Sequence, residues 1–450
     1  MHPVLWIVFS LYRFHCSMQR NDDGGRFLAV KYAGTVSRGG ILLDLRDFYN
    51  MKARRVGPSI IAQMARMLGP DGISFTSGEP SADLIPLSGL REAFSKACEQ
   101  APLFSYPTTA GHLPLREWIT DWMHREALAP SWLDPSCVIL TNGSQGALNL
   151  LAETFIDPGD VILTESPTYP EALLAFQREG ARILPIPVDE EGPIPERLEE
   201  RLSVGKAKFF YTVVNFQNPS GCTTSDERKA AILDLARRKG FFIIEDDPYR
   251  YLRYEGNPTK SYFQMAGEDR RVAYLGSFSK IIAPGVRCGW CAFPPDLREK
   301  LLDIRLSLEL CPPALTQAAV LEFLRACDFD AHLGRLAKEY RNRRDSLVQA
   351  LDREASGLGL RLTVPKGGFF LWGTCEGIRD MSGFARYAAL QKKVGFIPGR
   401  FFFPIEGEGE DSIRFAFAKA TPEQSQVGAA RFADALRNYR NGLPPEMNLQ

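Results

Sequence analysis

Short apolar runs alternate with amphipathic segments from residue 138 onward. The apolar runs predict buried strands, and the helical periodicity between them predicts helices packed on those strands. The strand-like runs cover residues 138–141, 161–164, 209–214, 241–245, 272–275 and 288–293. This order predicts an α/β fold with three layers, in which a mostly parallel sheet lies between helices.

One of the intervening segments carries signals for both ends of a helix. Thr224-Ser225-Asp226-Glu227 has the form of a capping box, and Gly240 is typical of a helix C-terminus. We therefore expect a single helix between the runs 209–214 and 241–245. The three elements together predict a strand–helix–strand crossover.

The pattern changes near residue 326, where a long charged helix over 329–351 begins. Strand and turn material follows it through residues 413–417, which predicts a second, smaller α+β domain. The expected organisation is an N-terminal extension over 1–50, for which disorder is one interpretation, a segment over 51–86 that joins the small domain, a large cofactor-binding domain over 87–325, the small domain over 326–440 and a tail over 441–450.

The composition narrows the class of protein. The chain has 450 residues, of which 45% are hydrophobic and 24% charged, as in ordinary globular proteins. It has 54 Lys and Arg against 54 Asp and Glu, so its formal net charge is 0. Nucleic acids and anionic membranes require a broad positive field, and we expect neither as a partner.

The nine cysteines are scattered without regular spacing, which favours reduced thiols and a cytoplasmic protein. Cys288-Gly289-Trp290-Cys291 has the C-x-x-C form of a redox pair or half a zinc site. It lies in a strand-like run, where residues i and i+3 point to opposite faces, so we interpret both cysteines as core residues. The five histidines have no ligand or catalytic-triad spacing, and no metal site is predicted.

An apolar stretch over residues 4–12 could be mistaken for the core of a secretory signal. It lacks a basic start and a cleavage site, and it is far shorter than the ~20 residues of a membrane span. We interpret it as part of a variable extension.

Ligands of open α/β sheets bind at the carboxyl ends of the strands, and several runs end in polar motifs. Asn142-Gly143-Ser144-Gln145-Gly146 opens a helix and suits a phosphate, although the same residues are common in ordinary turns. Asn215 to Gly221 is compatible with a turn alone. Glu245-Asp246-Asp247 ends an apolar strand, so either these acids meet a cation or they are solvated in a loop.

A lysine follows the run 272–275 in Gly276-Ser277-Phe278-Ser279-Lys280, and Arg287 lies seven residues further on. A lysine at a strand end can be desolvated and lose its proton, which makes it a nucleophile toward carbonyl groups. A solvated surface lysine is the alternative. The combination of all these motifs is more specific than any one of them.

Taken together, the motifs resemble the fold-type I pyridoxal-phosphate aminotransferases of class I/II. The matching motifs are Ser144-Gln145, Asn218-Pro219-x-Gly221, Asp246-x-x-Tyr249, Ser277-x-Ser279-Lys280-x6-Arg287 and Arg414. The similarity runs over residues 72–421 and is greatest to the 2-aminoadipate, kynurenine and aromatic aminotransferases. It implies pyridoxal 5′-phosphate as cofactor and an amino acid and a 2-oxo acid as substrates.

The resemblance also implies a role for each matching residue. Lys280 would bind the cofactor covalently and move the substrate proton, and Asp246 would pair with the pyridine nitrogen. Tyr249 and Asn218 would hydrogen-bond the ring oxygen, and Tyr169 would stack on the ring. The phosphate would be held by Ser144, Gln145, Ser277, Ser279 and Arg287. The substrate carboxylate would bind Arg414, with Gly78 beside it, and Tyr106 would reach the phosphate of a neighbouring subunit, which implies a homodimer.

The implied reaction moves an amino group from an aromatic, aliphatic or 2-aminoadipate-like amino acid to a 2-oxo acid. Relatives that favour acidic side chains often carry an arginine where residues 60–64 are mostly apolar here, which favours aromatic or aliphatic donors. Two alternatives stay open. One is a β-eliminating C–S lyase with the same cofactor, and the other is a regulatory domain that binds the cofactor without catalysis.

Overall fold

The computed structural model describes residues 14–20, 26–32, 44–203 and 205–442. It divides into two compact units, Met1–Arg54 and Arg55–Gln450. In the first unit, β1 (Phe14–Arg20) and β2 (Arg26–Tyr32) form an antiparallel pair. A 3-10 helix, η1 (Leu45–Phe48), and a short helix, α2 (Met51–Arg55), follow. The apolar stretch 4–12 and the end of the predicted tail, 443–450, lie outside the described residues.

The second unit is built on an eight-stranded sheet in the order β4-β11-β10-β9-β8-β5-β6-β7. The five strands from β10 to β6 are parallel, whereas β11 runs antiparallel to β10 and β4, and β7 is antiparallel to β6. The predicted mostly parallel sheet is confirmed. The strands are β4 (Val138–Thr141), β5 (Val161–Ser166), β6 (Arg182–Asp189), β7 (Gly192–Pro193), β8 (Phe209–Val213), β9 (Phe242–Asp246), β10 (Val272–Ser277) and β11 (Gly289–Ala292).

The pattern of apolar runs missed β6 and β7. Two prolines, Pro185 and Pro187, interrupt the sequence of β6, and several of its residues are exposed or half-buried. Proline is tolerated mainly toward the edge of a sheet, where a strand need not be a continuous apolar run. The missed strands therefore lie at one end of the sheet.

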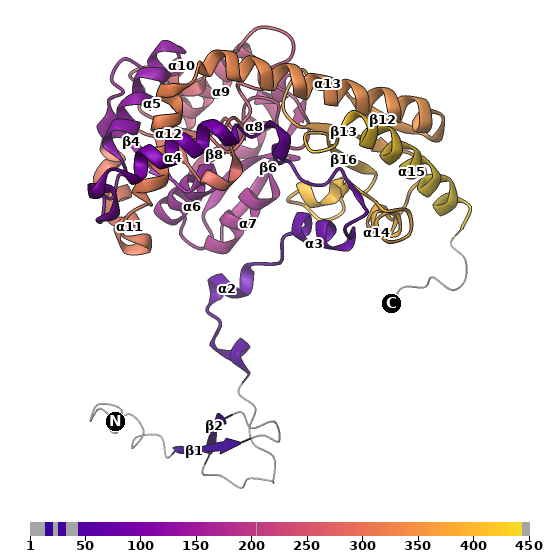
Figure 1. Cartoon of the computed structure of the whole chain (residues 1–450), viewed down its shortest axis with the longest axis horizontal. Helices are drawn as coiled ribbons and strands as arrows, with labels where there is room; N and C mark the ends of the chain where they lie inside the picture. Colours follow the sequence, from indigo (N-terminus) through magenta and orange to yellow (C-terminus); the bar gives the residue numbers. More distant parts are fainter. Residues whose placement is uncertain (1–13, 21–25, 33–43, 204, 443–450) are drawn as a thin grey trace. The chain divides into compact units, whose positions relative to one another are not determined.

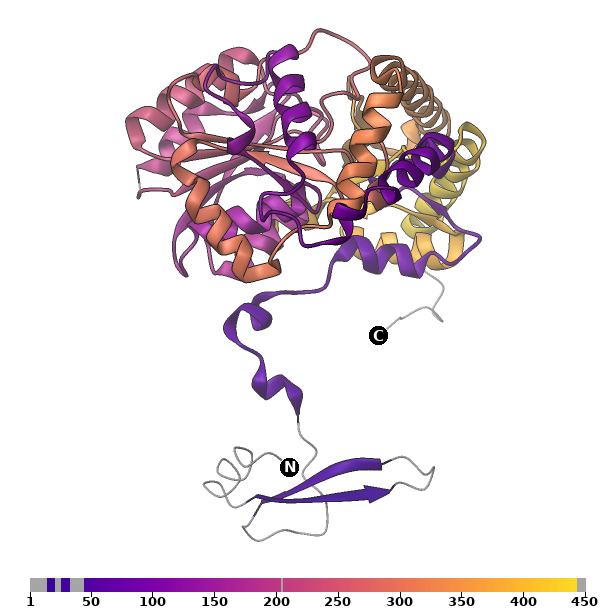
Figure 2. The ribbon, with the colours of Figure 1, turned by 60° about the vertical axis from the view of Figure 1, so that its left-hand side comes forward.

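Helices lie on both sides of this sheet, as the two views show (Figures 1 and 2). They are α4 (Leu87–Cys98), α5 (Leu113–Arg125), α6 (Gly143–Phe155), α7 (Pro170–Glu179), α8 (Pro195–Leu202), α9 (Asp226–Lys239), α10 (Tyr262–Ala266), α11 (Arg298–Glu309) and α12 (Ala314–Ala326). The predicted crossover helix is α9, and Gly240 ends it with a positive φ of 75°. Its N-cap is Ser225, which accepts a hydrogen bond from the Arg228 N–H, so the predicted capping box from Thr224 is wrong by one residue.

A four-stranded sheet in the order β12-β13-β16-β15 lies toward the C-terminus, beside the helices labelled α13, α14 and α15 in Figure 1. Its elements are α13 (Phe329–Ala355), β12 (Leu360–Thr363), β13 (Phe370–Cys375), α14 (Met381–Lys392), β14 (Val394–Gly395), β15 (Ile397–Pro398), β16 (Ser412–Ala416) and α15 (Pro422–Arg440). Single 3-10 turns connect many elements of the unit: η2 (Ala82–Leu84), η3 (Ala101–Phe104), η4 (Pro135–Cys137), η5 (Pro284–Val286), η6 (Pro295–Leu297), η7 (Ser356–Leu358) and η8 (Gly399–Phe402).

The segment before α4 returns to this C-terminal region. The strand β3 (Ile73–Ser74) pairs in parallel with β14, and α3 (Ile60–Met67) precedes it. Phe75 is fully buried with Phe396 and Phe415 in a core that is separate from the core of the large sheet. These contacts agree with a segment that joins the small domain, while the domain boundaries themselves stay predictions.

Cys288 and Cys291 are buried free thiols; Cys288 directly precedes β11 and Cys291 lies within it. Burial raises the pKa of Cys288 to about 12 and also raises that of Cys291, so both remain protonated at neutral pH. Their interpretation as core residues fits this environment. No described helix combines the length and the apolar character needed to cross a lipid bilayer.

Candidate active site

A cavity of about 270 Å³ lies where β4, β8, β9 and β10 end. Among the predicted site residues, all except Tyr106 line it. The predicted residues in the lining are Gly78, Ser144, Gln145, Tyr169, Asn218, Asp246, Tyr249, Ser277, Ser279, Lys280, Arg287 and Arg414. Tyr106 is instead 85% exposed on the surface.

Lys280 lies three residues after the end of β10 and points into this cavity. Its Nζ donates a hydrogen bond to the backbone carbonyl of Gly78 at 2.9 Å. Burial lowers the pKa of Lys280 to about 8, although the carboxylates of Glu79 and Asp246 oppose this effect. Part of the population is therefore an uncharged amine near neutral pH, and the alternative of an ordinary solvated lysine does not hold.

Asp246 ends β9 and has one satisfied and one unsatisfied oxygen. Its Oδ2 accepts a hydrogen bond from the Tyr211 hydroxyl at 2.9 Å, and no described residue donates to its buried Oδ1. Burial raises the pKa of Asp246 to about 7, while the Tyr211 hydrogen bond and Lys280 lower it. A buried carboxylate oxygen without a donor is costly, so this position suits an N–H group or cation from a ligand.

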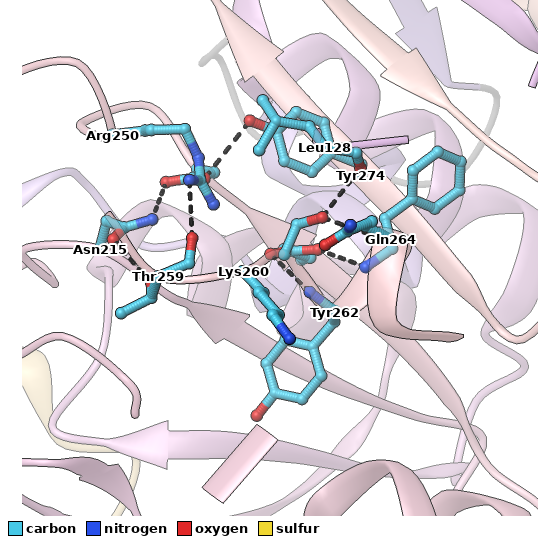
Figure 3. A network of polar contacts seen from close by, with 12 residues as sticks. Leu128, Asn215, Arg250, Thr259, Lys260, Tyr262, Gln264 and Tyr274 are labelled. Atoms are coloured by element: carbon cyan, nitrogen blue, oxygen red, sulfur yellow. Dashed lines mark hydrogen bonds and ion pairs between the residues drawn. The ribbon is translucent and has the colours of Figure 1, made fainter. Parts of the chain in front are cut away.

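The two acids beside Asp246 face away from the cavity and are paired. Asp247 accepts from Asn215 at 2.8 Å and forms a 2.6 Å ion pair with Arg250 (Figure 3). Glu245 accepts the backbone N–H groups of Tyr262 and Phe263 at the start of α10. All three acids are buried, so the alternative of solvated loop acids is wrong.

Backbone N–H groups, two serines and a guanidinium converge at the start of α6. Within the described structure the side chain of Asn142 does not cap this helix, which leaves its first N–H groups free for a ligand. Arg287 donates to the Asn142 carbonyl at 2.7 Å and to Ser279 Oγ at 3.4 Å, and Ser277 Oγ accepts the Ser279 N–H at 3.1 Å. This arrangement is typical of a phosphate cradle.

Gly143, the first residue of α6, is needed for this cradle. Its φ is +72°, and a Cβ placed on it would lie 2.9 Å from Arg287 Nη2. A larger residue would be strained and would displace the guanidinium from the cradle.

On another side of the cavity, Arg414 lies in the middle of β16 and is 1% exposed. Its guanidinium donates to Asn218 Oδ1 at 2.8 Å and to the Thr76 carbonyl, and its carbon lies 4.5 Å and 4.8 Å from the ring centroids of Phe370 and Phe402. No carboxylate of the described residues pairs with it, and its Nε has no partner among them. Burial lowers the pKa of Arg414 to about 10, so it is still a cation at neutral pH. A buried cation without an anion suits an incoming carboxylate.

The two predicted tyrosines complete the lining. Tyr249 packs edge-on against Phe369 and Phe370, with centroid distances of 5.7 Å, and Lys280 Nζ lies 6.0 Å from its ring centre. Tyr169 is the N-cap residue of α7. Burial raises the pKa of both phenols, so each is a neutral hydroxyl that can donate a hydrogen bond.

Sequence reasoning missed Tyr211, Thr76 and Glu171. Tyr211 lies in the apolar run Phe209–Val213, where a hydroxyl must find a partner, and this could have suggested a contact with a neighbouring strand end. Thr76 contributes only its backbone carbonyl, which any residue could supply. Glu171 lies in the first turn of α7, where an acidic residue is common, so no sequence motif marks either residue as part of the site. The described residues hold no cluster of three or more His, Cys, Asp or Glu side chains that could bind a metal ion.

The family model described as "Aminotransferase class I and II" matches residues 70–432 of this chain. The chain belongs to this family. It is a pyridoxal-phosphate-dependent aminotransferase of fold type I, and the predictions of family, fold, enzyme class and cofactor are confirmed.

Individual relatives agree with this assignment. The aromatic-amino-acid aminotransferase 1 of Thermococcus litoralis is 34% identical over 404 residues, which cover 88% of this chain and 95% of that protein. The 2-aminoadipate transaminase of Thermus thermophilus is 33% identical over 400 residues, covering 88% and 98%. Among solved structures, the kynurenine aminotransferase of Pyrococcus horikoshii in complex with PMP has a TM-score of 0.82 and 32% identity, and the match covers 88% of this aminotransferase and 98% of that chain.

Proposed function

We infer that this aminotransferase moves the amino group of an aromatic, aliphatic or 2-aminoadipate-like amino acid to a 2-oxo acid in the cavity around Lys280. The observation that carries this proposal is the buried guanidinium of Arg414, which has no carboxylate partner among the described residues and lines the same cavity as Lys280. Every amino donor and every 2-oxo acid carries the carboxylate that this guanidinium lacks. Arg414 therefore suits both substrates of a transamination.

The residues present fit the cofactor. When bound, pyridoxal 5′-phosphate supplies an electrophilic aldehyde and a ring that accepts electron density from the substrate. Asp246 Oδ1, the unsatisfied oxygen, would accept the ring N–H, and Tyr169 would lie on the ring face. Asn218 and Tyr249 would hydrogen-bond the ring oxygen. The phosphate would occupy the cradle of Ser144, Gln145, Ser277, Ser279 and Arg287.

Lys280 has two tasks in this proposal. Its Nζ would first bind the aldehyde carbon, for which the lowered pKa of about 8 makes the uncharged amine accessible. The same nitrogen would also be the base that moves the proton of the substrate Cα. Arg414 would hold the substrate carboxylate by two parallel hydrogen bonds and so fix the direction of the Cα–H bond.

We further propose that the enzyme is a cytoplasmic homodimer in which Tyr106 serves the partner's site. The 85% exposure of Tyr106 is compatible with this proposal, because the side chain is accessible to a second subunit. The end of α11 is near the cradle, since Asn142 donates to Glu309 at 3.1 Å. Other large apolar residues are exposed near Tyr106 in sequence and at the end of α11, namely Phe104, Leu113, Leu306, Leu308 and Leu310.

The reaction type is tested by a half-reaction. An amino acid added alone to the loaded enzyme is expected to convert the bound aldehyde stoichiometrically to pyridoxamine phosphate, followed by absorbance, and 2-oxoglutarate is expected to restore it. If a β-substituted donor instead yields ammonia and pyruvate while the aldehyde persists, the enzyme is a lyase. Sedimentation of an active monomer would contradict the dimer.

A further inference from the structure

Glu171 is a charged residue of the active-site cavity to which the proposed reaction gives no task. It is in the first turn of α7, two residues after Tyr169, and it lines the cavity together with Lys280 and Arg414. Its carboxylate raises the pKa of both cations against the effect of burial, which indicates that its field reaches them.

The other carboxylates of the cavity are already paired or assigned. Glu79 forms a 2.8 Å ion pair with Lys419, and Asp246 is assigned to the cofactor ring. Glu171 Oε1 accepts only the hydroxyl of Ser59, at 3.2 Å, and no described residue donates to its buried Oε2. Glu171 is thus a carboxylate without a cation in direct contact among the residues that the structure describes.

A second cavity, of about 470 Å³, shares Glu171 with the first. Its walls come from the start of α3, from α7 and from the loop over residues 400–410. Several lining residues are apolar, namely Ile60, Leu173, Leu174, Phe401, Phe403 and Ile405. These walls suit a chain of methylene groups that ends beside Glu171.

The charges of the second cavity are predominantly negative. Besides Glu171 it contains Glu406 and Glu410, against the single guanidinium of Arg400, which lies 3.6 Å from Glu410. A side chain that ends in a carboxylate would meet repulsion here, and one that ends in an ammonium would neutralise an unpaired charge.

We propose that Glu171 is a specificity-determining residue, which favours amino donors whose aliphatic side chain ends in a positively charged group and disfavours donors that end in a carboxylate. The inference rests on the proposed function: it keeps the aliphatic side chain, adds a positively charged end group and disfavours the 2-aminoadipate-like donors. The chemical class is that of lysine and its shorter and longer homologues, reacting at the α-amino group.

Three donors of similar length test the proposal: lysine, norleucine and 2-aminoadipate. Glu171→Gln keeps the size of the side chain and an acceptor for the Ser59 hydroxyl, and it removes only the charge. We expect kcat/KM for lysine to fall about 10- to 100-fold, as for the loss of one hydrogen bond to a charged group. The same substitution also removes a charge that acts on Lys280 and Arg414, so the specificity is read from ratios: kcat/KM for lysine should fall relative to that for norleucine, and that for 2-aminoadipate should rise relative to it.

Two control variants sharpen the result. Glu171→Asp keeps the charge and should retain most of the preference for lysine over norleucine. Glu190→Gln removes a glutamate from an exposed turn between β6 and β7 and should change none of the three values.

The possible failures are distinguishable. If the wild type converts no amino donor, the proposed function is wrong. If the wild type and Glu171→Gln convert norleucine equally and have the same ratio of lysine to norleucine, only the role of Glu171 is wrong. If kcat/KM falls by the same factor for lysine and for norleucine in Glu171→Gln, Glu171 acts on residues that all donors use, and the specificity proposal is overturned.

Discussion

Two regions near the ends of β8, β9 and β10 each contain a lysine, an arginine and acids. They differ in the hydrogen-bond and ion-pair partners of these charged groups. One is the cavity with Lys280, Arg414 and Asp246. The other, which we call the paired network, contains Lys229, Arg250, Asp247 and Glu245 and is shown in part in Figure 3. Burial lowers the pKa of both lysines to about 8, so the pKa alone does not separate the regions.

The number of partners does separate them. Lys229 Nζ donates to Thr259 Oγ1 at 2.8 Å and to the Lys260 carbonyl at 2.7 Å, whereas Lys280 Nζ donates only to Gly78. In the paired network Asp247 has three donors, while Asp246 has one and an unsatisfied oxygen. One guanidinium nitrogen of Arg250 also lacks a partner, but Arg250 is ion-paired with Asp247, whereas Arg414 has no carboxylate partner among the described residues. We conclude that the ion-paired charges stabilise the fold, and we propose that the buried charges without an oppositely charged partner are arranged for ligands.

The largest effects are expected when the arginine of each region is replaced: one substitution should weaken substrate binding and the other should lower the free energy of unfolding. Arg414→Ala should lower kcat/KM for amino acids and 2-oxo acids alike, by about 2 to 5 kcal/mol in transition-state binding, because a buried charge pair with the substrate is lost. Arg250→Ala should instead lower the free energy of unfolding by about 3 to 5 kcal/mol, because Asp247 loses its buried cation. Kinetics and chemical unfolding of both variants measure the two effects. An Arg250→Ala enzyme of normal stability with weakened substrate binding would break the distinction.

The next comparison is between Asp246 and Asp247, whose substitution should change the free energy of unfolding in opposite directions. The folded-state pKa of Asp246 is raised from 3.8 to about 7, so between these pH values the folded protein binds more protons than the unfolded chain. This contribution destabilises the cofactor-free protein increasingly as pH rises from 4 to 7, by at most about 1.4 kcal/mol per pH unit. Asp246→Asn should remove it, so the variant gains stability relative to the wild type over that range.

The matched variant Asp247→Asn should lose stability at every pH in this range, because it breaks the pair with Arg250. In the loaded enzyme Asp246→Asn should lower kcat more than it changes KM for the donor, since Arg414, which we propose binds the substrate carboxylate, is intact. Equal pH profiles for Asp246→Asn and the wild type would contradict the assignment of an unsatisfied buried carboxylate.

The smallest effect concerns the ionisation of Lys280. The rate at which added pyridoxal phosphate attaches to the cofactor-free protein should rise with pH through about 8, because only the uncharged amine reacts. Glu79 raises the pKa of Lys280, so Glu79→Gln should move this midpoint to lower pH by less than about one unit. A midpoint near 10.5, the ordinary value for lysine, would contradict the burial of Nζ.

The part of the site that could be predicted lies in local motifs. Ser277, Ser279 and Lys280 are adjacent in sequence, and the start of α6 follows β4 directly, so strand ends and a helix start were sufficient to place them. Arg414 was predicted only through the family resemblance, because its partner Thr76 is 338 residues away in the chain. No periodicity encodes such a contact.

The remaining residues depend on packing. Tyr211 reaches Asp246 across neighbouring strands, and the register of that pair is set by the sheet as a whole. Ser59, the N-cap residue of α3, donates a hydrogen bond to Glu171 of α7. No motif near either residue predicts this contact. The strand β6 is not predicted because Pro185 and Pro187 interrupt its apolar run. Long-range contacts and edge strands are thus what the sequence pattern alone does not specify.

We propose that Lys280 binds the cofactor, and that Lys229, which is fully buried and has its pKa lowered to the same value of about 8, does not. Borohydride reduction of the loaded enzyme, followed by digestion and mass spectrometry, tests it directly. In the wild type we expect one labelled peptide, which contains Lys280. The Lys280→Ala variant should still fold and should carry no label. A label on Lys229, or a labelled peptide that survives in Lys280→Ala, would contradict it.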